Sequence, residues 1–282
     1  MKGRKIITRL IFLVGFIICC YPLVSSLLER QHLKGAVSTY QESVSEKDKS
    51  DIEAIFEKAH EYNSMLFQSN GASVDGMQST GGVLSDENYN SILSQGETGI
   101  MGSIEIPKIG VDLPIYHGTS DEVLSNGVGH VQDSSLPVGG ESTRCVLTGH
   151  RGLPNSKLFT RLDEIKKGDL FFLNVFGETL AYKVNDIQVI EPEEVDVLNI
   201  EEGKDLVSLI TCTPYGLNTH RLVVTGERVE YEKAKYENIQ ESLPSWREIL
   251  FAVLPFAFLG VAVAFYIKDR RAMKNETKNI KK

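Results

Sequence analysis

The chain has 282 residues, enough for one large domain or two small ones with a sizeable hydrophobic core. The formal net charge is −8, yet both ends are basic: residues 1–34 hold six Lys or Arg against one acidic residue, and residues 268–282 hold seven against two. The part between these ends is therefore strongly acidic. This distribution argues against nucleic-acid binding, because the basic surface would then lie on the folded domain.

Two long apolar runs predict membrane-spanning helices. Leu10–Leu28 and Ile249–Ile267 each contain 19 residues and no charge, and about 20 apolar residues span the hydrocarbon core of a bilayer. The first run could instead belong to a cleaved signal peptide, because basic residues precede it. No A-x-A-like cleavage site follows, with Ser25-Ser26 the nearest approximation, so a retained anchor is favoured.

The flanks of the second run predict its orientation. Trp246 and Tyr266 lie at its two edges, and Lys268, Arg270 and Arg271 follow it. This arrangement is typical of an aromatic belt followed by cytoplasmic basic residues. We therefore expect a cell-membrane protein with two transmembrane helices, both termini in the cytoplasm, and an extracellular segment from about residue 30 to residue 245.

Four cysteines divide between the first apolar run and the exported part. Cys19 and Cys20 lie in the run, which leaves Cys145 and Cys212 outside the cell. Two cysteines in an exported domain usually form a disulfide. A Cys145–Cys212 bridge is therefore one interpretation, and a free thiol at Cys212 is the other.

The region before the β-rich part divides in two. Residues 36–68 place apolar side chains at helical spacing, which predicts one or two amphipathic helices that pack on the domain or lead up from the membrane. Residues 69–99 are dominated by Ser, Asn, Gly, Gln and Asp. An irregular segment of this length is usually a functional lid or a flexible linker.

From Gly102 onward the sequence predicts a mainly β domain. Short apolar or alternating runs are separated by turn signals such as Val138-Gly-Gly, a pattern typical of a closed barrel or a sandwich. The predicted strands are 103–107, 111–116, 143–148, 170–175, 180–184, 187–190, 206–212 and 222–224. We expect a helical turn near 157–162 and an acidic loop over 191–205.

The run Leu206–Gly226 predicts a β-hairpin, because Pro214, Gly216 and Asn218 interrupt two apolar strands. Cys212 ends the first strand and Arg221 begins the second. A thiol that faces a fixed cation across a hairpin is a candidate nucleophile with a partner for an oxyanion.

A nucleophilic thiol needs an acid–base partner, which is usually a histidine. His150 is the best candidate, because it ends strand 143–148 and enters an exposed Gly-rich turn. His117 and His130 lie near turns and could simply satisfy backbone groups, and His220 would point to the opposite face from Arg221. No metal-ligand spacing is present, so we expect neither a metal nor a cofactor.

These motifs carry a resemblance to a known family. Leu147-Thr-Gly-His-Arg-Gly-Leu-Pro154 and Ile210-Thr-Cys-Thr-Pro-Tyr-Gly-Leu-Asn-Thr-His-Arg-Leu222 closely resemble the sortases, membrane-anchored cysteine transpeptidases of Gram-positive bacteria, and specifically the class C group that assembles pili. Supporting matches are Ile104–Ile109, Leu113–Gly118, Gly129-His130 and Ser135–Gly140, so the resemblance runs from about Tyr62 to Arg228.

The resemblance implies a sortase-type closed β-barrel and a catalytic triad of His150, Cys212 and Arg221. It also implies the substrate: Cys212 would cleave an LPxTG-like sorting signal of a pilin or surface protein through a thioacyl intermediate. A lysine of a neighbouring pilin would then accept the acyl group. A free Cys212 is required for this chemistry, which disfavours the disulfide.

The chain departs from the class C pattern at the lid. Such enzymes typically carry an Asp-Pro-aromatic tripeptide over the active site, and this chain has none. Asp75-Gly76-Met77 could mimic it, with Asp75 against Arg221 and Met77 over Cys212. Asp86-Glu-Asn, near Tyr89, is a second candidate, and a linker without any plug is the alternative.

The predicted layout has six parts. They are a cytoplasmic tail and first transmembrane helix (1–34), an extracellular helical and lid segment (35–99), the catalytic barrel (100–232), a juxtamembrane linker (233–248), the second transmembrane helix (249–267) and a basic cytoplasmic tail (268–282). Pilin polymerisation is the favoured function. The alternatives are a sortase that anchors surface proteins to peptidoglycan, a cysteine peptidoglycan transpeptidase of another kind, and an inactive pilin-binding scaffold.

Overall fold

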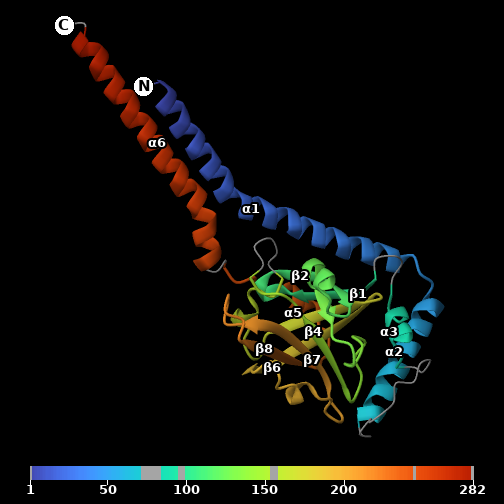
Figure 1. Ribbon diagram of the computed structural model, residues 1–282. Coiled ribbons are helices and arrows are strands. Elements are labelled where there is room, and N and C mark those ends of the chain that lie inside the picture. Colours follow the sequence, from blue (N-terminus) through green and yellow to red (C-terminus); the bar gives the residue numbers. More distant parts are fainter. Residues whose placement is uncertain (1, 71–83, 95–98, 153–157, 244–245, 281–282) are drawn as a thin grey trace. The chain divides into compact units, whose positions relative to one another are not determined.

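The computed structural model describes residues 2–70, 84–94, 99–152, 158–243 and 246–280 (Figure 1). Its α-helices are α1 (Lys2–Ser45), α2 (Lys49–Asn70), α3 (Asp86–Ser91), α4 (Asp121–Asn126), α5 (Lys233–Glu237) and α6 (Trp246–Ile280). Its strands are β1 (Ile100–Ile106), β2 (Val111–His117), β3 (Val128–His130), β4 (Thr143–Thr148), β5 (Leu170–Val175), β6 (Glu178–Ile190), β7 (Asp205–Thr213) and β8 (His220–Val229). Short 3-10 turns cover Pro107–Ile109, Leu162–Glu164 and Asp196–Leu198.

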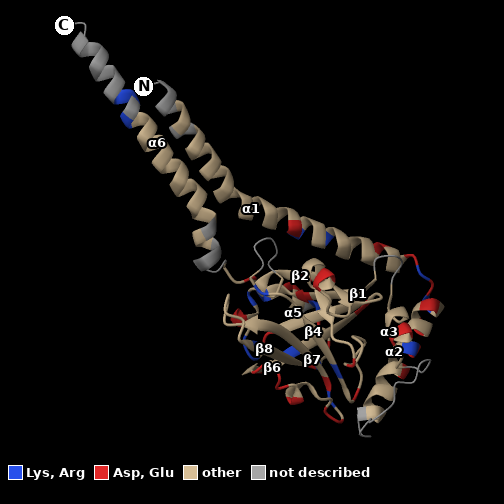
Figure 2. Ribbon diagram, in the orientation of Figure 1, with Lys and Arg blue, Asp and Glu red and all other residues tan. Residues whose placement is uncertain are grey.

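The chain divides into two compact units, Met1–Leu28 with Leu243–Lys282, and Glu29–Ser242. In the first unit the apolar stretches of α1 and α6 touch: the ring centroid of Phe12 lies 5.4 Å from that of Phe258 and 6.0 Å from that of Phe265. Gly15 allows this approach, because a Cβ there would lie 2.9 Å from the Phe258 ring. The described side chains of both stretches carry no charge (Figure 2).

The first apolar run lies in a helix that could cross a membrane. Among the described residues, α1 is the one helix that is long and apolar enough, over Leu10–Ser45. The apolar segment of α6, Ala252–Lys268, is shorter. The second span and the cytoplasmic placement of the termini therefore stay predictions.

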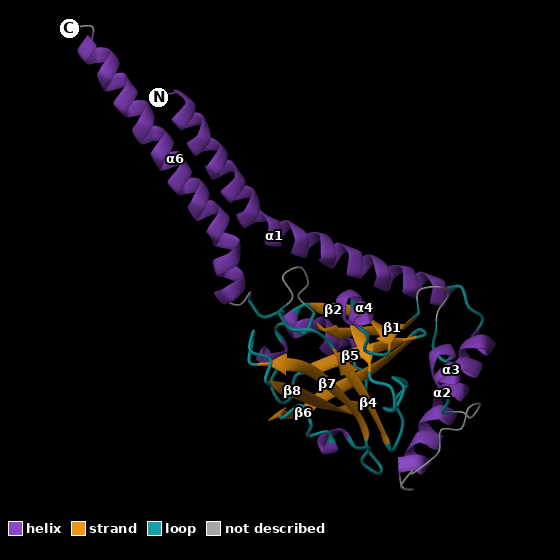
Figure 3. Cartoon of the chain, viewed as in Figure 1, coloured by secondary structure: helices purple, strands orange, loops and turns teal. Residues whose placement is uncertain are grey.

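The β-strands close into an eight-stranded barrel in the order β1-β2-β3-β4-β7-β8-β6-β5 (Figure 3). The pairs β2–β3 and β4–β7 are parallel and the others are antiparallel. The mainly β closed barrel with short helices is therefore confirmed. The division into separate strands 180–184 and 187–190 is wrong: both belong to β6, which continues through a bulge between Val184 and Asp186.

A tight turn between β5 and β6 anchors the second half of α1. Phe176 and Gly177 form this turn with φ of 45° and 87°, the positive values that a two-residue hairpin turn requires. The Phe176 amide donates to Tyr40 Oη at 2.9 Å, and Tyr40 Oη donates to the Met101 carbonyl at 3.1 Å. One buried tyrosine thus joins α1, β1 and the turn.

The predicted amphipathic region forms the end of α1 and the whole of α2. Residues 46–48 connect the two helices. Ala59, Tyr62, Asn63 and Leu66 of α2 are buried, at the i, i+3, i+4, i+7 spacing of one helical face. Of the two expectations for this region, packing on the domain is confirmed, because Ala59, Tyr62 and Leu66 belong to the hydrophobic core of the unit Glu29–Ser242.

Candidate active site

The β7–β8 hairpin places Cys212 directly opposite Arg221. Opposed residues of antiparallel strands have Cβ atoms about 4.5–5.5 Å apart, so the two side chains are neighbours on one face. Both are half-buried. The intervening turn is closed by the Leu217 and Asn218 amides, which donate to the Pro214 carbonyl at 3.1 and 3.0 Å.

The Arg221 guanidinium keeps its charge available. Its Nη1 donates to the carbonyls of Asn218 at 3.2 Å and His220 at 3.1 Å. Among the residues that the structure describes, no carboxylate pairs with it. A cation held by backbone carbonyls can still donate to a developing oxyanion.

The parallel pairing of β4 and β7 brings His150 to the same edge. Thr148 is paired with Ile210, and the Gly149 amide then donates to the Ile210 carbonyl at 3.1 Å. Thr211 Oγ1 donates back to the Gly149 carbonyl at 2.8 Å. Extended two residues beyond the Thr148–Ile210 pair, the same register would set half-buried His150 opposite Cys212.

Gly149 is required by the packing at this edge. A Cβ at this position would lie 2.9 Å from the Phe159 ring. The Phe159 amide donates to the His150 carbonyl at 3.1 Å. Phe159 therefore contacts the backbone at Gly149 through its ring and at His150 through its amide. A larger residue at 149 would push the His150 backbone away from β7.

The two cysteines of the unit Glu29–Ser242 have opposite environments. Both are free thiols, so the interpretation of a Cys145–Cys212 disulfide is wrong. Cys145 is 3% exposed in the core, and burial raises the pKa of its thiol well above the ordinary value. Because the thiolate is the nucleophile, Cys145 is unsuited to attack a substrate, whereas Cys212 is half-buried beside an arginine.

Three other histidines are occupied elsewhere. His130 is fully buried, with Nδ1 3.0 Å from Tyr89 Oη and Nε2 2.9 Å from the Ser135 carbonyl, and burial lowers its pKa to about 4. His117 Nε2 donates to the Ile92 carbonyl at 2.8 Å, and burial lowers its pKa too. His220 Nε2 pairs with Glu191 at 3.1 Å. For His117 and His130, these contacts agree with the interpretation that the two side chains satisfy backbone groups.

The structure also settles one of the two lid candidates. Asp86 accepts a hydrogen bond from Gln132 Nε2 at 2.6 Å, and Tyr89 is 1% exposed between His117 and His130. α3 is thus held against the ends of β2 and β3, and the Asp86 carboxylate is bonded to Gln132 and not to Arg221. The other candidate, Asp75 and Met77, lies outside the described residues.

Two buried arginines beside these strands were missed by the sequence analysis. Arg151 is 7% exposed; its Nη1 donates to Thr213 Oγ1 at 3.1 Å, and its Nη2 pairs with Asp163. Its position directly after His150 was visible in the sequence, but a Gly-rich turn does not predict that a cation is buried there. Its guanidinium also lies 5.9 Å from the ring centre of Tyr215.

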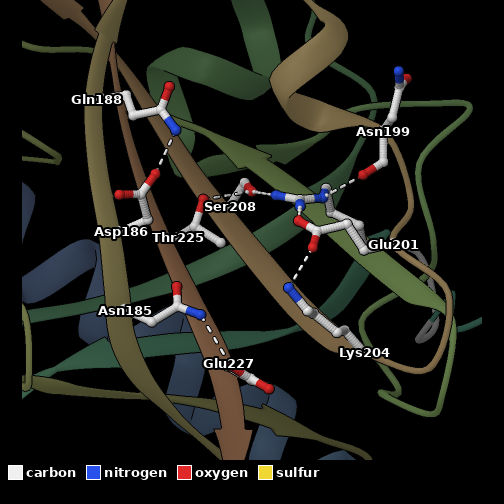
Figure 4. A network of polar contacts seen from close by, with 10 residues as sticks. Asn185, Asp186, Gln188, Asn199, Glu201, Lys204, Ser208, Thr225 and Glu227 are labelled. Atoms are coloured by element: carbon white, nitrogen blue, oxygen red, sulfur yellow. Dashed lines mark hydrogen bonds and ion pairs between the residues drawn. The ribbon is translucent and has the colours of Figure 1, made fainter.

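The second arginine, Arg144, lies at the opposite end of β4. It donates through Nε to the Asn199 carbonyl at 2.7 Å, through Nη1 to Ser208 Oγ at 2.9 Å and through Nη2 to Glu201 at 2.6 Å (Figure 4). Ser208 Oγ in turn lies 3.1 Å from Thr225 Oγ1. Arg144 therefore ties β4 to β7 and to the β6–β7 loop.

No group of three His, Cys, Asp or Glu side chains in the described part of the chain could hold a metal ion. The expectation that no metal or cofactor is needed stays a prediction. The chemistry available at the Cys212 edge is that of a thiol, an imidazole and a guanidinium.

Comparison with known proteins identifies the family. A model of the sortase domain matches residues 104–229. Sortase D of Bacillus subtilis is 34% identical over 149 residues, which cover 51% of this chain and 72% of that protein. The crystal structure of sortase C1 from Streptococcus agalactiae has 45% sequence identity and a TM-score of 0.64, and covers 70% of this chain and 99% of that one.

A further solved structure is that of Clostridium perfringens sortase C with the C-terminal cell wall sorting motif. It has 42% identity and a TM-score of 0.60, and covers 70% of this chain and 99% of that chain. The range matched by the family model, residues 104–229, contains His150, Cys212 and Arg221. The chain therefore belongs to the sortase family of cysteine transpeptidases, and its structural neighbours are class C members.

Proposed function

We propose that Cys212 is the nucleophile of this transpeptidase, Arg221 the oxyanion donor and His150 the acid–base group. The observation that carries the proposal is the cross-strand pair of Cys212 and Arg221, with His150 brought alongside by the β4–β7 register. A thiol, a permanent cation and an imidazole at one strand edge are the groups that acyl transfer requires.

In the first half-reaction, the Cys212 thiolate attacks the Thr carbonyl of an LPxTG-like sorting signal. The C–S bond forms, the carbonyl oxygen becomes an oxyanion, and Arg221 donates to it. Collapse of this intermediate breaks the Thr–Gly bond, and His150 gives its proton to the departing Gly amine. The product is a thioester between the substrate and Cys212.

In the second half-reaction, an amine resolves the thioester. The neutral amine attacks the thioester carbonyl, His150 takes a proton from it as the new C–N bond forms, and the Cys212 thiolate leaves. With a pilin lysine as the acceptor, the product is an isopeptide bond and a pilus longer by one subunit. Because a thioester keeps the acyl group activated, no nucleotide is consumed outside the cell.

The solved relatives support pilin substrates. One is titled sortase C1 of the pilus island 1 of GBS, and one concerns pilin substrate specificity of Streptococcus pneumoniae sortase C. The Clostridium perfringens relative was solved with a cell wall sorting motif. We propose the same substrates for this chain. We also propose the six-part layout predicted from its sequence, with parts at residues 1–34, 35–99, 100–232, 233–248, 249–267 and 268–282.

We also propose that α6 forms a second span beside α1. The ring contacts of Phe12 with Phe258 and Phe265, and the close approach at Gly15, are those of two packed apolar helices. This arrangement would place both basic ends in the cytoplasm. Cysteines introduced singly into residues 35–69 and into the C-terminal tail would be labelled from outside and from inside, respectively, by a membrane-impermeant maleimide.

The test of function uses cells that carry the full-length chain and a pilin with a sorting signal. Wild type should give a ladder of pilin polymers, and Cys212→Ala should give monomers. The linkage in the ladder, determined by mass spectrometry, should be a Thr–Lys isopeptide. A Thr joined to a peptidoglycan stem peptide would instead indicate cell-wall anchoring, and polymers formed with Cys212→Ala would indicate a scaffold.

A further inference from the structure

We propose that Arg151 and Thr213 form one half of a strand bracket that positions His150 against Cys212. By strand bracket we mean the two hydrogen bonds Arg151–Thr213 and Gly149–Thr211. Each joins a chain neighbour of His150 to a chain neighbour of Cys212. The inference rests on the proposed roles of His150 and Cys212 and names the residues that set their distance.

The first half of the bracket lies before the reactive pair. Thr211 is 1% exposed, and its hydroxyl donates to the Gly149 carbonyl at 2.8 Å. This side-chain bond adds to the backbone bond from the Gly149 amide to the Ile210 carbonyl, which extends the parallel β4–β7 ladder by one position. It fixes the backbone as it enters His150.

The second half lies after the reactive pair and cannot come from the ladder. β4 ends at Thr148, so the backbone beyond His150 no longer pairs with β7. The Arg151 guanidinium replaces that pairing by donating from Nη1 to Thr213 Oγ1 at 3.1 Å. Without it, the segment after His150 would have no described bond to the strand that carries Cys212.

Arg151 is itself held from two further directions. Nη2 pairs with Asp163, and the guanidinium lies 5.9 Å from the ring centre of Tyr215. A planar guanidinium can meet acceptors in fixed directions at once, whereas a lysine offers a single point charge. The side chain of Arg151 is 3% exposed, so water does not compete for these positions.

Burial of Arg151 also carries a free-energy cost, which a residue with a purely structural role would not need. Its Nε is buried without a hydrogen-bond partner among the residues that the structure describes, and such an unsatisfied donor opposes folding. Arg144 and Arg161, two other buried arginines, both use Nε as a donor. The site therefore keeps Arg151 for the geometry of its two terminal nitrogens.

The strand bracket predicts that Arg151 and Thr213 affect the rate of the chemical steps and not the affinity for substrate. A small displacement of an acid–base group from its nucleophile lowers the rate of the chemical steps, whereas substrate contacts stay in place. Arg151 and Thr213 are therefore positioning residues. They act through His150 and Cys212, and the bracket leaves the oxyanion donor Arg221 untouched.

The test compares Thr213→Val with Thr213→Ser in the full-length enzyme, with the rate of cleavage of an LPxTG-type peptide normalised to titrated Cys212 thiol. Thr213→Val keeps the side-chain shape and removes the acceptor, and should lower kcat about 10-fold with KM unchanged. Thr213→Ser restores the hydroxyl and should recover kcat. Arg151→Met should lower kcat further, and Arg151→Met combined with Thr213→Val should be no slower than Arg151→Met alone.

Arg144→Met is the matched control, because it removes a buried arginine from the far end of β4, the strand that leads into His150. It should lower the melting temperature and leave kcat per thiol unchanged. Wild-type kcat in Thr213→Val, failure of Thr213→Ser to recover it, or an equal loss in Arg144→Met would overturn the bracket. Peptide cleavage by Cys212→Ala would overturn the proposed function and the bracket together.

Discussion

Asn63 of α2 and Leu136 exchange two hydrogen bonds: Asn63 Nδ2 donates to the Leu136 carbonyl at 3.2 Å, and the Leu136 amide donates to Asn63 Oδ1 at 2.7 Å. Asn63 is 3% exposed, so both bonds are shielded from water. Leu136 lies in the loop between β3 and β4. A single side chain thus docks the helix before the barrel onto the loop that leads into β4.

Asn63→Ala should therefore destabilise the protein by about 2–4 kcal/mol, because it leaves the buried Leu136 amide and carbonyl without partners. Urea unfolding of the detergent-solubilised chain measures this. Glu61→Ala is the control, since Glu61 is exposed on the same helix, and should change stability by less than about 0.5 kcal/mol. Equal stability of both variants would show that α2 is not docked through Asn63.

Arg221→Lys should lower kcat about 100-fold to 1,000-fold with little change in KM, because an ammonium cannot reproduce the placement of the guanidinium donors. Arg228→Lys is a matched control on the same strand. Arg228 lies 3.9 Å from Asp205 at the far end of β8, so its replacement should leave kcat at the wild-type level. A fully active Arg221→Lys enzyme would exclude Arg221 as the oxyanion donor.

Iodoacetamide should modify Cys212 in the folded enzyme and Cys145 only after unfolding. Cys145 is 3% exposed and burial raises the pKa of its thiol, so it offers neither access nor thiolate. Peptide mapping by mass spectrometry, with and without urea, separates the two sites. Labelling of Cys145 at the rate of Cys212 in the absence of urea would contradict this assignment.

Stability should fall as the pH drops from about 6.5 towards 4. Burial lowers the pKa of His130 from 6.5 to about 4, so in this window the unfolded state binds a proton that the folded state does not. The contribution is therefore fully present above pH 6.5 and is lost progressively below it, by about 3 kcal/mol at most. Urea unfolding across this range measures the loss.

His130→Gln is the variant that isolates this effect. It removes the titrating group, so its stability should change less than that of wild type between pH 6.5 and pH 4. Half-buried Asp205 acts in the opposite direction within the same measurement, because partial burial raises the pKa of its carboxyl. Parallel curves for wild type and His130→Gln would mean that other groups dominate the acid response.

The local part of the site could be predicted from the sequence. Cys212 and Arg221 are separated by eight residues that contain Pro214, Gly216 and Asn218, and such a short interrupted segment predicts a hairpin. The alternation of the strands likewise predicted a barrel or sandwich. Both inferences depend on contacts between residues that are close in the chain.

Non-local contacts could not be derived in this way. His150 and Cys212 are 62 residues apart in sequence, and their proximity depends on the parallel pairing of β4 with β7. The resemblance to sortases supplied His150 as a partner where the residues alone left alternatives. The role of Arg151 was missed for a related reason: its partners Asp163 and Thr213 lie in two other segments, and a buried cation has no signature in a loop sequence.

The position of β7 between β4 and β8 has a consequence for how the enzyme becomes active. The strand that bears Cys212 is the last but one to be synthesised, and it must insert beside a strand made much earlier before His150 and Arg221 flank the thiol. A chain whose barrel is incomplete therefore holds its thiol without the two groups proposed to assist it. Acyl-transfer activity is in this sense a readout of completed barrel assembly.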